Sequence, residues 1–296
     1  MSSDTVTKLS AAMADYPHTL PLKNGQIRSD LVALDFVETK PVTKAFKPMV
    51  REQRFDVSEL ALATFLQAKA YNKPLVLLPA TVMGRFQHGC MLHNAERGKL
   101  TPSDLVGRRV GVRAYSQTTG VWLRGILQND YGVDVGRVHW ITFEDAHVAE
   151  YKDPAGVERA AADKNMTKML QDGELDAAVY GAAMPDDPRL QSVIPDPDEA
   201  ARAWYDKHGV IPVNHMIVVT AALEQSRPDL VTEIYRMLCD GKKIAGLPHA
   251  TGIDTIPFGY EANRPAIELM TSYMLQQGLI ADRVAIDDVL ARKLQV

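Results

Sequence analysis

Short apolar runs alternate along this sequence with stretches in which apolar residues recur at helical spacing. The runs have the length and composition of buried strands, and the stretches between them fit one face of an amphipathic helix. Strand-like runs occupy residues 31–37, 75–79, 89–93, 109–112, 138–141, 175–181 and 210–220. This alternation predicts an α/β architecture.

The clearest helix signal follows the strand-like run at 109–112. Apolar positions from Trp122 to Leu127 fall on one helical face, and Gly132 is a suitable C-terminal stop. We also expect a helix to start within 55–66, with Ser58 as its N-cap. Further helices are predicted at 164–171, from Ser226 to a stop at Gly241, at 265–277, and from about Asp287.

The order of these elements suggests one domain inserted into another. A stretch rich in Pro and Asp at 185–197 precedes a strand that returns to the first part of the chain. We therefore expect lobe 1 to be discontinuous, formed by residues 1–97 and 196–296. Lobe 2 is expected to be the inserted segment 98–195.

Charge and hydropathy exclude several classes of protein. The 296 residues include 33 Lys and Arg against 37 Asp and Glu, a net charge of −4. A mildly acidic chain without basic runs lacks the electrostatic pattern of a nucleic-acid-binding protein. The sequence contains neither a basic amphipathic stretch nor a run of about 18 apolar residues, so we expect no membrane role.

The first residues and the cysteines indicate a compartment. The N-terminus carries Asp4 and no apolar segment, unlike a secretory signal. Cys90 and Cys239 are the only two cysteines and lie in apolar surroundings, so we expect buried thiols and no disulfide. Both observations favour a cytoplasmic protein.

Common catalytic and metal-binding motifs are missing from the sequence. It contains no GxGxxG, GxxxxGK[ST], HExxH, CxxC or GxSxG pattern. His88, Cys90 and His93 are close in sequence, but on a strand His88 and His93 would point to opposite faces. We therefore expect no metal site there.

The polar segment Tyr115–Gly120 lies between a strand end and a helix start. Backbone N–H groups at a helix N-terminus hold carboxylates well. Ser116, Thr118 and Thr119 would add hydroxyl donors, and Arg113 would add positive charge. An ordinary helix cap with no ligand remains the alternative reading.

Two histidines and an arginine are further candidates. Arg85 and His88 are close in sequence and would supply a fixed cation and a group that titrates near neutral pH. A surface ion pair and a hydrogen-bonded histidine are the alternative. His215 lies in an otherwise apolar strand, where a hydrogen-bonded core histidine is the alternative.

Seven blocks of residues occur together in a recognisable order. They are Phe55-Asp-Val-Ser-Glu, Arg85-Phe-Gln-His, Leu105-Val-Gly-Arg-Arg-Val-Gly-Val, Val121-Trp-Leu-Arg-Gly-Ile-Leu-Gln-Asn-Asp-Tyr-Gly-Val-Asp, Val138-His-Trp, Met169-Leu-Gln-Asp-Gly-Glu-Leu-Asp-Ala and Ile211-Pro-Val-Asn-His. From about residue 25 to 240 the chain resembles the 4,5-dihydroxyphthalate decarboxylases. The resemblance implies a two-lobed type II periplasmic-binding-protein-like fold, with a ligand cleft between the lobes.

The resemblance also implies a reaction and roles for residues. Loss of CO2 from a hydroxylated aromatic diacid needs no cofactor when the ring carbon is protonated first. We expect His88 to be the general acid, His215 to orient the phenol or exchange that role, and Glu59 to be a base. The expected carboxylate clamps are Arg85, Arg113, Tyr115, Ser116, Gln117, Thr118, Thr119 and Arg124.

Other readings of the same fold stay open. A solute-binding protein for an aromatic or sulfonated acid, working with an ABC importer, would use the same clamps without a proton donor. A cytoplasmic enzyme of pyrimidine or menaquinone biosynthesis is a third reading. In each case the expected partner is a small molecule, here an aromatic carboxylate. The apolar faces of the C-terminal helices fit packing on the core as well as a homo-oligomer.

Overall fold

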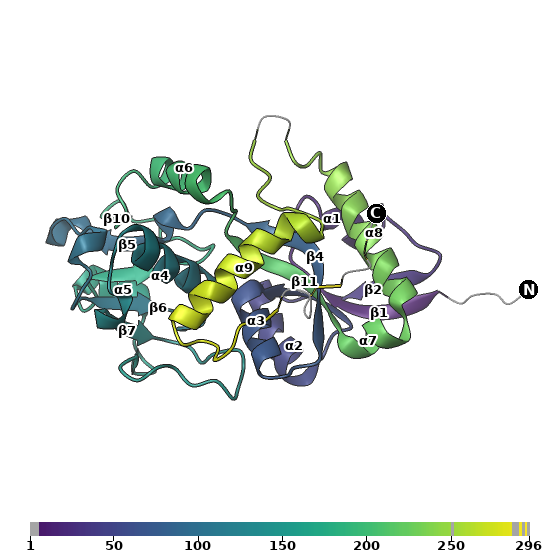
Figure 1. The fold of residues 1–296 in the computed structure, drawn as a ribbon, viewed down its shortest axis with the longest axis horizontal. Helices are drawn as coiled ribbons and strands as arrows, with labels where there is room; N and C mark the ends of the chain where they lie inside the picture. Colours follow the sequence, from purple (N-terminus) through teal and green to yellow (C-terminus); the bar gives the residue numbers. More distant parts are fainter. Residues whose placement is uncertain (1–5, 250–251, 286–289, 292–293, 295–296) are drawn as a thin grey trace, which may run out of the picture. The chain divides into compact units, whose positions relative to one another are not determined.

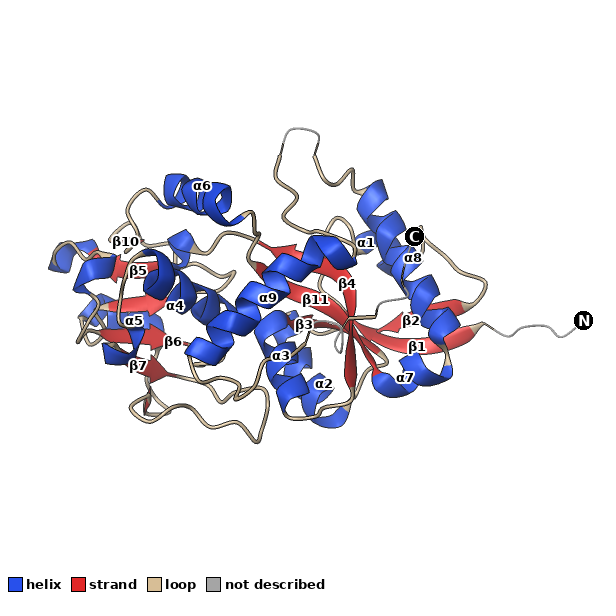
Figure 2. Cartoon of the chain, in the orientation of Figure 1, coloured by secondary structure: helices blue, strands red, loops and turns tan. Residues whose placement is uncertain are grey.

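The computed structural model describes residues 6–249, 252–285, 290–291 and 294. The chain divides into two compact units, which we call unit 1 and unit 2. Unit 1 is drawn from Met1–Arg85, Val213–Glu268 and Val284–Val296, and unit 2 from Phe86–Pro212 and Leu269–Arg283. Each unit contains one sheet with helices (Figures 1 and 2), which agrees with the predicted α/β architecture.

Unit 1 is built on a five-stranded mixed sheet. Its strands, in spatial order, are β2 (Val32–Phe36), β1 (Thr7–Ala12), β3 (Val57–Ala61), β11 (Val213–Thr220) and β4 (Leu75–Gly84). β11 runs antiparallel to both of its neighbours. The helices of this unit are α1 (Leu20–Lys23), α2 (Phe46–Glu52), α3 (Leu62–Ala70), α7 (Ala221–Ser226), α8 (Pro228–Ile244) and the first part of α9 (Tyr260–Gln276).

Unit 2 is built on a six-stranded mixed sheet. In spatial order the strands are β10 (Leu190–Ser192), β5 (Met91–Asn94), β9 (Ala177–Val179), β6 (Arg109–Val112), β7 (His139–Thr142) and β8 (Glu158–Arg159). Its helices are α4 (Thr118–Asp130), α5 (Met166–Asp172), α6 (Pro197–His208) and the last part of α9. Short 3-10 turns are η1 (Val42–Ala45) in unit 1, and η2 (His88–Cys90), η3 (Ala95–Arg97), η4 (Pro102–Asp104) and η5 (Val135–Arg137) in unit 2.

The inserted unit is larger than the predicted segment 98–195. β5 pairs with β9 and β10, so the chain has joined the second sheet before residue 98. At the other end, the Trp204 ring of α6 packs edge-on against His88 and Trp122. Pairing and aromatic contacts, which composition does not reveal, thus extend unit 2 on both sides.

The predicted helix start at Ser58 is wrong. Residues 57–61 form β3, every one of them is buried, and the helix begins only at Leu62 after Ala61 as N-cap. β3 is central in the sheet, between β1 and β11, and a strand covered on both faces has an unbroken apolar pattern. That pattern fits a buried helix equally well.

Two other element predictions need correction. α8 continues through Gly241 to Ile244. The glycine is needed for packing, because a Cβ at Gly241 would lie 2.2 Å from the carbonyl oxygen of His18. This glycine allows close packing and does not end the helix. The predicted strand at 89–93 begins only at Met91, after the turn η2. The helix predicted from Asp287 lies outside the described residues.

Each unit has its own apolar core. In unit 1, the predicted apolar face of α8, including Leu230 and Ile234, packs with strand residues such as Leu78 and Val219. In unit 2, α5 and strand residues form a second cluster around Leu170. Within the described part of the chain, no helix has both the length and the apolar character required to cross a bilayer.

Candidate active site

A buried carboxylate and an imidazole meet on the sheet of unit 1. Glu59 lies in β3, opposite Ile217 of the antiparallel β11, and His215 is two residues from Ile217. Residues two apart on a strand share a face, so Glu59 and His215 form a diagonal pair across the two strands. The pairing of β11 with β4 is irregular around His215, as is common next to functional residues.

Three donors converge on the Glu59 carboxylate. His215 Nδ1–H donates to Oε1 at 2.6 Å, the Tyr16 hydroxyl donates to the same oxygen at 2.9 Å, and the Ala14 N–H donates to Oε2 at 2.9 Å. Glu59 is completely buried. Burial alone would raise its pKa, but the hydrogen bond and charge of His215, with the other two donors, hold the pKa below its usual value. Glu59 is therefore ionised near neutral pH.

One of the two ring nitrogens of His215 is unpaired among the described residues. Its Nδ1 is occupied by Glu59, whereas Nε2 has no hydrogen-bond partner among the described residues. The ring packs edge-on against Phe46, with centroids 5.1 Å apart, and 14% of the side chain is exposed. An imidazole oriented through Nδ1 by a carboxylate can hold or transfer a proton at Nε2.

Tyr16 and His18 support this pair, and the sequence analysis missed both. Their rings stack at 5.3 Å with an interplanar angle of 3°. His18 Nε2–H donates to the carbonyl oxygen of Val82 at 3.1 Å, which fixes the stack. Burial, with the negative charge of Glu59, raises the pKa of Tyr16, so it stays a hydroxyl donor. The segment Tyr16-Pro-His carries no spacing signal that links it to Glu59.

Arg85 directly follows β4 in unit 1. Gly84 of this strand pairs with Val213, two residues before His215 in β11. The register thus brings Arg85 to the same end of the β4–β11 pair as His215. Its side chain is half-buried.

The predicted anion loop forms the start of α4 in unit 2. Gln117 is the N-cap residue and makes no side-chain capping bond, while Thr118 and Thr119 belong to the first turn. Tyr115, Ser116, Thr118 and Thr119 are all buried. Gln117 Oε1 is buried and has no hydrogen-bond partner among the described residues. A helix start with buried hydroxyls and an unused acceptor suits a polar ligand.

Arg124 lies behind this loop. Its side chain is fully buried, its Nη2 donates to the carbonyl oxygen of Tyr115, and its Nε donates to Gln277 at 2.8 Å. The guanidinium carbon stacks 3.9 Å from the centre of the Tyr115 ring. No carboxylate forms an ion pair with Arg124 in the described part of the chain. Arg124 therefore fixes the loop, and its positive charge, which interacts with the Asp153 carboxylate without forming an ion pair, lies beneath it.

Arg113 has a different environment from the loop that follows it. Its Nη1 lies 3.4 Å from Glu144 Oε2, and 30% of the Arg113 side chain is exposed. The guanidinium is thus already shared with an exposed carboxylate. Arg113 is a weaker candidate for a substrate clamp than the buried residues of the α4 start.

His88 is buried in an aromatic cluster of unit 2. It is 1% exposed, and neither ring nitrogen has a hydrogen-bond partner among the described residues. The Trp204 ring lies edge-on to it, with centroids 6.0 Å apart. Burial lowers the pKa of His88 to about 4, although the charge of Asp130 opposes this shift. His88 is therefore neutral near pH 7.

The helix α6, which covers η2, was also missed. Trp204 Nε1, Lys207 Nζ and His208 Nε2 all donate to the carboxylate of Asp130, at 2.7–3.0 Å. The sequence does contain a start signal, since Pro197 is followed by Asp198 and Glu199 in the first turn. The Pro- and Asp-rich composition obscured it.

Metal ligands are not grouped in this structure. The residues that it describes contain no cluster of three or more His, Cys, Asp or Glu side chains able to hold a metal ion. Neither Cys90 nor Cys239 forms a disulfide.

Solved structures of binding proteins share the fold. The alkanesulfonate-binding protein SsuA from Xanthomonas axonopodis pv. citri is 13% identical, covers 98% of this chain and 99% of its own, and has a TM-score of 0.56. A Candida albicans protein with the generic periplasmic binding protein fold is 12% identical, covers 98% of both chains, and has a TM-score of 0.59. These similarities establish the predicted periplasmic-binding-protein-like fold and nothing further.

Curated sequences identify closer relatives. No model of a protein family matches the chain. A 4,5-dihydroxyphthalate decarboxylase from Comamonas testosteroni is 29% identical over 302 residues, which cover 96% of this chain and 91% of the relative. Another from Pseudomonas putida is 31% identical over 210 residues, which cover 67% of this chain and 81% of the relative. The chain belongs to the 4,5-dihydroxyphthalate decarboxylase family.

Proposed function

We propose that the protein is a carboxy-lyase that removes CO2 from a hydroxylated aromatic diacid such as 4,5-dihydroxyphthalate, without oxidation. The observation that carries this proposal is His215, held at Nδ1 by the ionised Glu59 and without a partner at Nε2. Membership in the decarboxylase family supports the same reaction. A solute-binding protein has no need for an oriented proton donor.

The reaction begins with the imidazolium form of His215, whose Nε2 proton is transferred to the ring carbon that bears a carboxylate. His215 is left as the neutral Nδ1–H imidazole and takes up a proton from solvent before the next turnover. The ring hydroxyls donate electron density and stabilise the cationic ring. The carbon–carbon bond then breaks, its electron pair restores the aromatic ring, and CO2 leaves. The proton has replaced the carboxylate, and because no net oxidation occurs, the proposed reaction uses no redox cofactor.

Glu59 orients His215 in this scheme, which changes the role expected from the sequence. A carboxylate with a lowered pKa and three donors is a poor base. It holds the Nδ1–H in place and stabilises the imidazolium from which the Nε2 proton is transferred. The proton-donor role expected for His88 passes to His215, because His88 is neutral near pH 7.

The carboxylates of the substrate need cationic or N–H partners. In unit 1 we assign this role to Arg85, which follows β4 at the His215 end of the β4–β11 pair. In unit 2 the α4 start, where Ser116, Thr118 and Thr119 surround the helix N-terminus, is a candidate anion site in its own right. The positive charge of Arg124 beneath the loop favours an anion there. Gln117 Oε1 is suited to accept a hydrogen bond from a ring hydroxyl.

The test is incubation of the full chain with 4,5-dihydroxyphthalate in the presence of a chelator, with chromatography of the ring product. The proposal predicts equal amounts of CO2 and 3,4-dihydroxybenzoate, and their loss in Arg85→Ala but not in Arg54→Ala, a change at an exposed arginine. Absence of turnover together with a thermal shift by the same compound would instead indicate a binding protein.

A further inference from the structure

A cavity of about 610 Å³ lies in unit 2, apart from the residues used above. It borders the paired strands β5 and β10 and the start of α6. Leu100, Ile194 and Pro197 contribute apolar surface. This volume and lining are typical of pockets that hold small organic molecules.

His93 presents one fixed polar group to the cavity. It is 4% exposed, and its Nδ1–H donates to the carbonyl oxygen of Gln191, its cross-strand neighbour, at 3.0 Å. Burial lowers the pKa of His93, so the ring is neutral and Nε2 carries a lone pair. Nε2 has no hydrogen-bond partner in the described part of the chain. The cavity therefore offers an acceptor for an O–H or N–H group.

Two charged side chains complete the lining. Lys99 and Asp196 are both exposed, and neither has an ion-pair or hydrogen-bond partner for its side chain among the described residues. Lys99 supplies a cation for a carboxylate. Asp196 disfavours a second negative charge on the same ligand.

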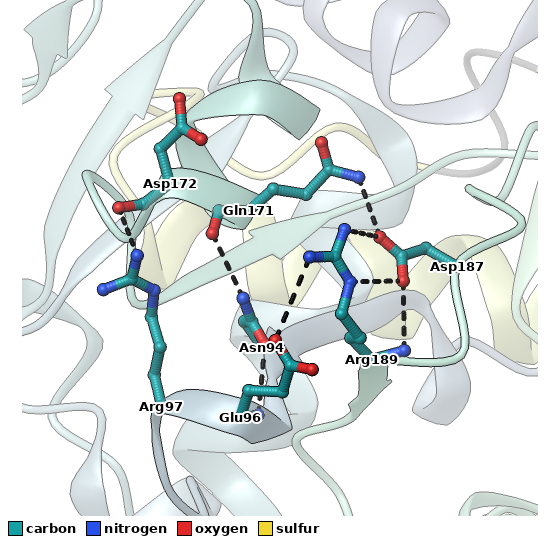
Figure 3. A network of polar contacts seen from close by, with 7 residues as sticks. All are labelled: Asn94, Glu96, Arg97, Gln171, Asp172, Asp187 and Arg189. Atoms are coloured by element: carbon teal, nitrogen blue, oxygen red, sulfur yellow. Dashed lines mark hydrogen bonds and ion pairs between the residues drawn. The ribbon is translucent and has the colours of Figure 1, made fainter.

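The wall of the cavity is held in place by a polar network (Figure 3). Asn94 Nδ2 donates to the carbonyl oxygen of Gln171 at 3.1 Å, and Arg97 donates to that of Asp172 at 2.6 Å. Between them, the N–H of Ala95, which lines the cavity, donates to the carbonyl oxygen of Arg189 at 2.8 Å. The site is thus fixed before any ligand binds, which lowers the entropy lost on binding.

We propose that this cavity is a second binding site, for a small hydroxylated aromatic monocarboxylate. The carboxylate pairs with Lys99, a ring hydroxyl donates to His93 Nε2, and the ring lies against Leu100 and Ile194. The ligand class follows from the lining. The reaction product belongs to this ligand class if the proposed function holds. It would then bind beside the turn η2, since Ser192 of the lining donates to the carbonyl oxygen of His88 at 3.4 Å.

Equilibrium dialysis of the full chain with 4-hydroxybenzoate tests the site. We expect Lys99→Met to weaken binding by about fivefold, the loss of one exposed charge contact. Lys152→Met, at another exposed lysine of unit 2, leaves binding unchanged. In the chain with both Arg85→Ala and His215→Ala, 4-methoxybenzoate and phthalate should bind more weakly than 4-hydroxybenzoate, because the first lacks the hydroxyl donor and the second adds a charge.

A chain with both Arg85→Ala and His215→Ala separates this site from the proposed active site. Retained binding in that chain supports the second site, whether or not the wild-type protein decarboxylates anything. Binding lost in that chain would place the ligand at the active site and overturn the proposal. No binding to the wild-type chain, or equal binding by the Lys99→Met and Lys152→Met chains, would overturn it as well.

Discussion

The half-buried His215 of unit 1 and the buried His88 of unit 2 lie in opposite surroundings. His215 donates to an ionised carboxylate and keeps one nitrogen for a reactant. His88 lies among aromatic rings, has no hydrogen-bond partner among the described residues, and has its pKa lowered to about 4. The comparison teaches that a hydrogen-bonded carboxylate orients an imidazole for proton transfer, whereas burial without a partner lowers the pKa of His88.

Glu59→Gln should remove the charged partner that distinguishes His215 from His88. The amide keeps the size of the side chain but cannot stabilise an imidazolium by charge. We expect kcat to fall by about 10²-fold with a small change in KM. Steady-state kinetics check this, with Glu224→Gln on the surface helix α7 as the control. An unchanged kcat would show that Glu59 does not act through His215.

His88 should make the free energy of unfolding depend on pH. The pKa of His88 is about 4 in the folded chain and about 6.5 in the unfolded chain, so the unfolded state binds the extra proton between these values. Stability is therefore lost as pH falls from about 6.5, by about 2 kcal/mol at pH 5. Urea unfolding followed by tryptophan fluorescence measures this in unit 2, which contains Trp122, Trp140 and Trp204.

The matching variant is His88→Leu, which should flatten this part of the pH dependence. His139→Leu, at an exposed histidine of β7, is the control. If the wild-type and His88→Leu chains lose stability in parallel on acidification, His88 is not a buried neutral imidazole.

Tyr16→Phe should produce the smallest effect. The change removes one of the donors to Glu59 and keeps the ring that stacks on His18. The pKa of Glu59 rises, so the acidic limb of the pH–rate profile moves to higher pH, by up to about one unit. At pH 7 the rate changes by less than about threefold. An acidic limb that coincides with that of the exposed control Tyr71→Phe would contradict this role.

Local patterns predicted several elements well. The apolar face of α8 and the strand β6 follow from spacing and turn residues. The helix α4 was also predicted, but it begins at Thr118, inside the segment 115–120 that was expected to precede it. Local patterns failed at β3, where burial on both faces removes the alternation of apolar and polar residues. They also failed at α6, where the Pro- and Asp-rich composition obscured the helix start. In both cases tertiary surroundings decided what the sequence pattern left ambiguous.

The candidate site shows the same limit. Glu59 and His215 were each recognised as candidates, yet only strand pairing joins residues 156 positions apart. Tyr16 has no motif and enters the site through a hydrogen bond. His88 was expected to be the general acid, but its burial by Trp204 depends on the unpredicted α6.

The most direct test compares CO2 release from 4,5-dihydroxyphthalate by His215→Gln and His88→Gln under single-turnover conditions. Since His215 holds the transferred proton, its loss should slow the chemical step by about 10³-fold. The His88→Gln chain should keep its rate within about tenfold. A slow His88→Gln chain and a fast His215→Gln chain would contradict the account and indicate that His88 is the proton donor.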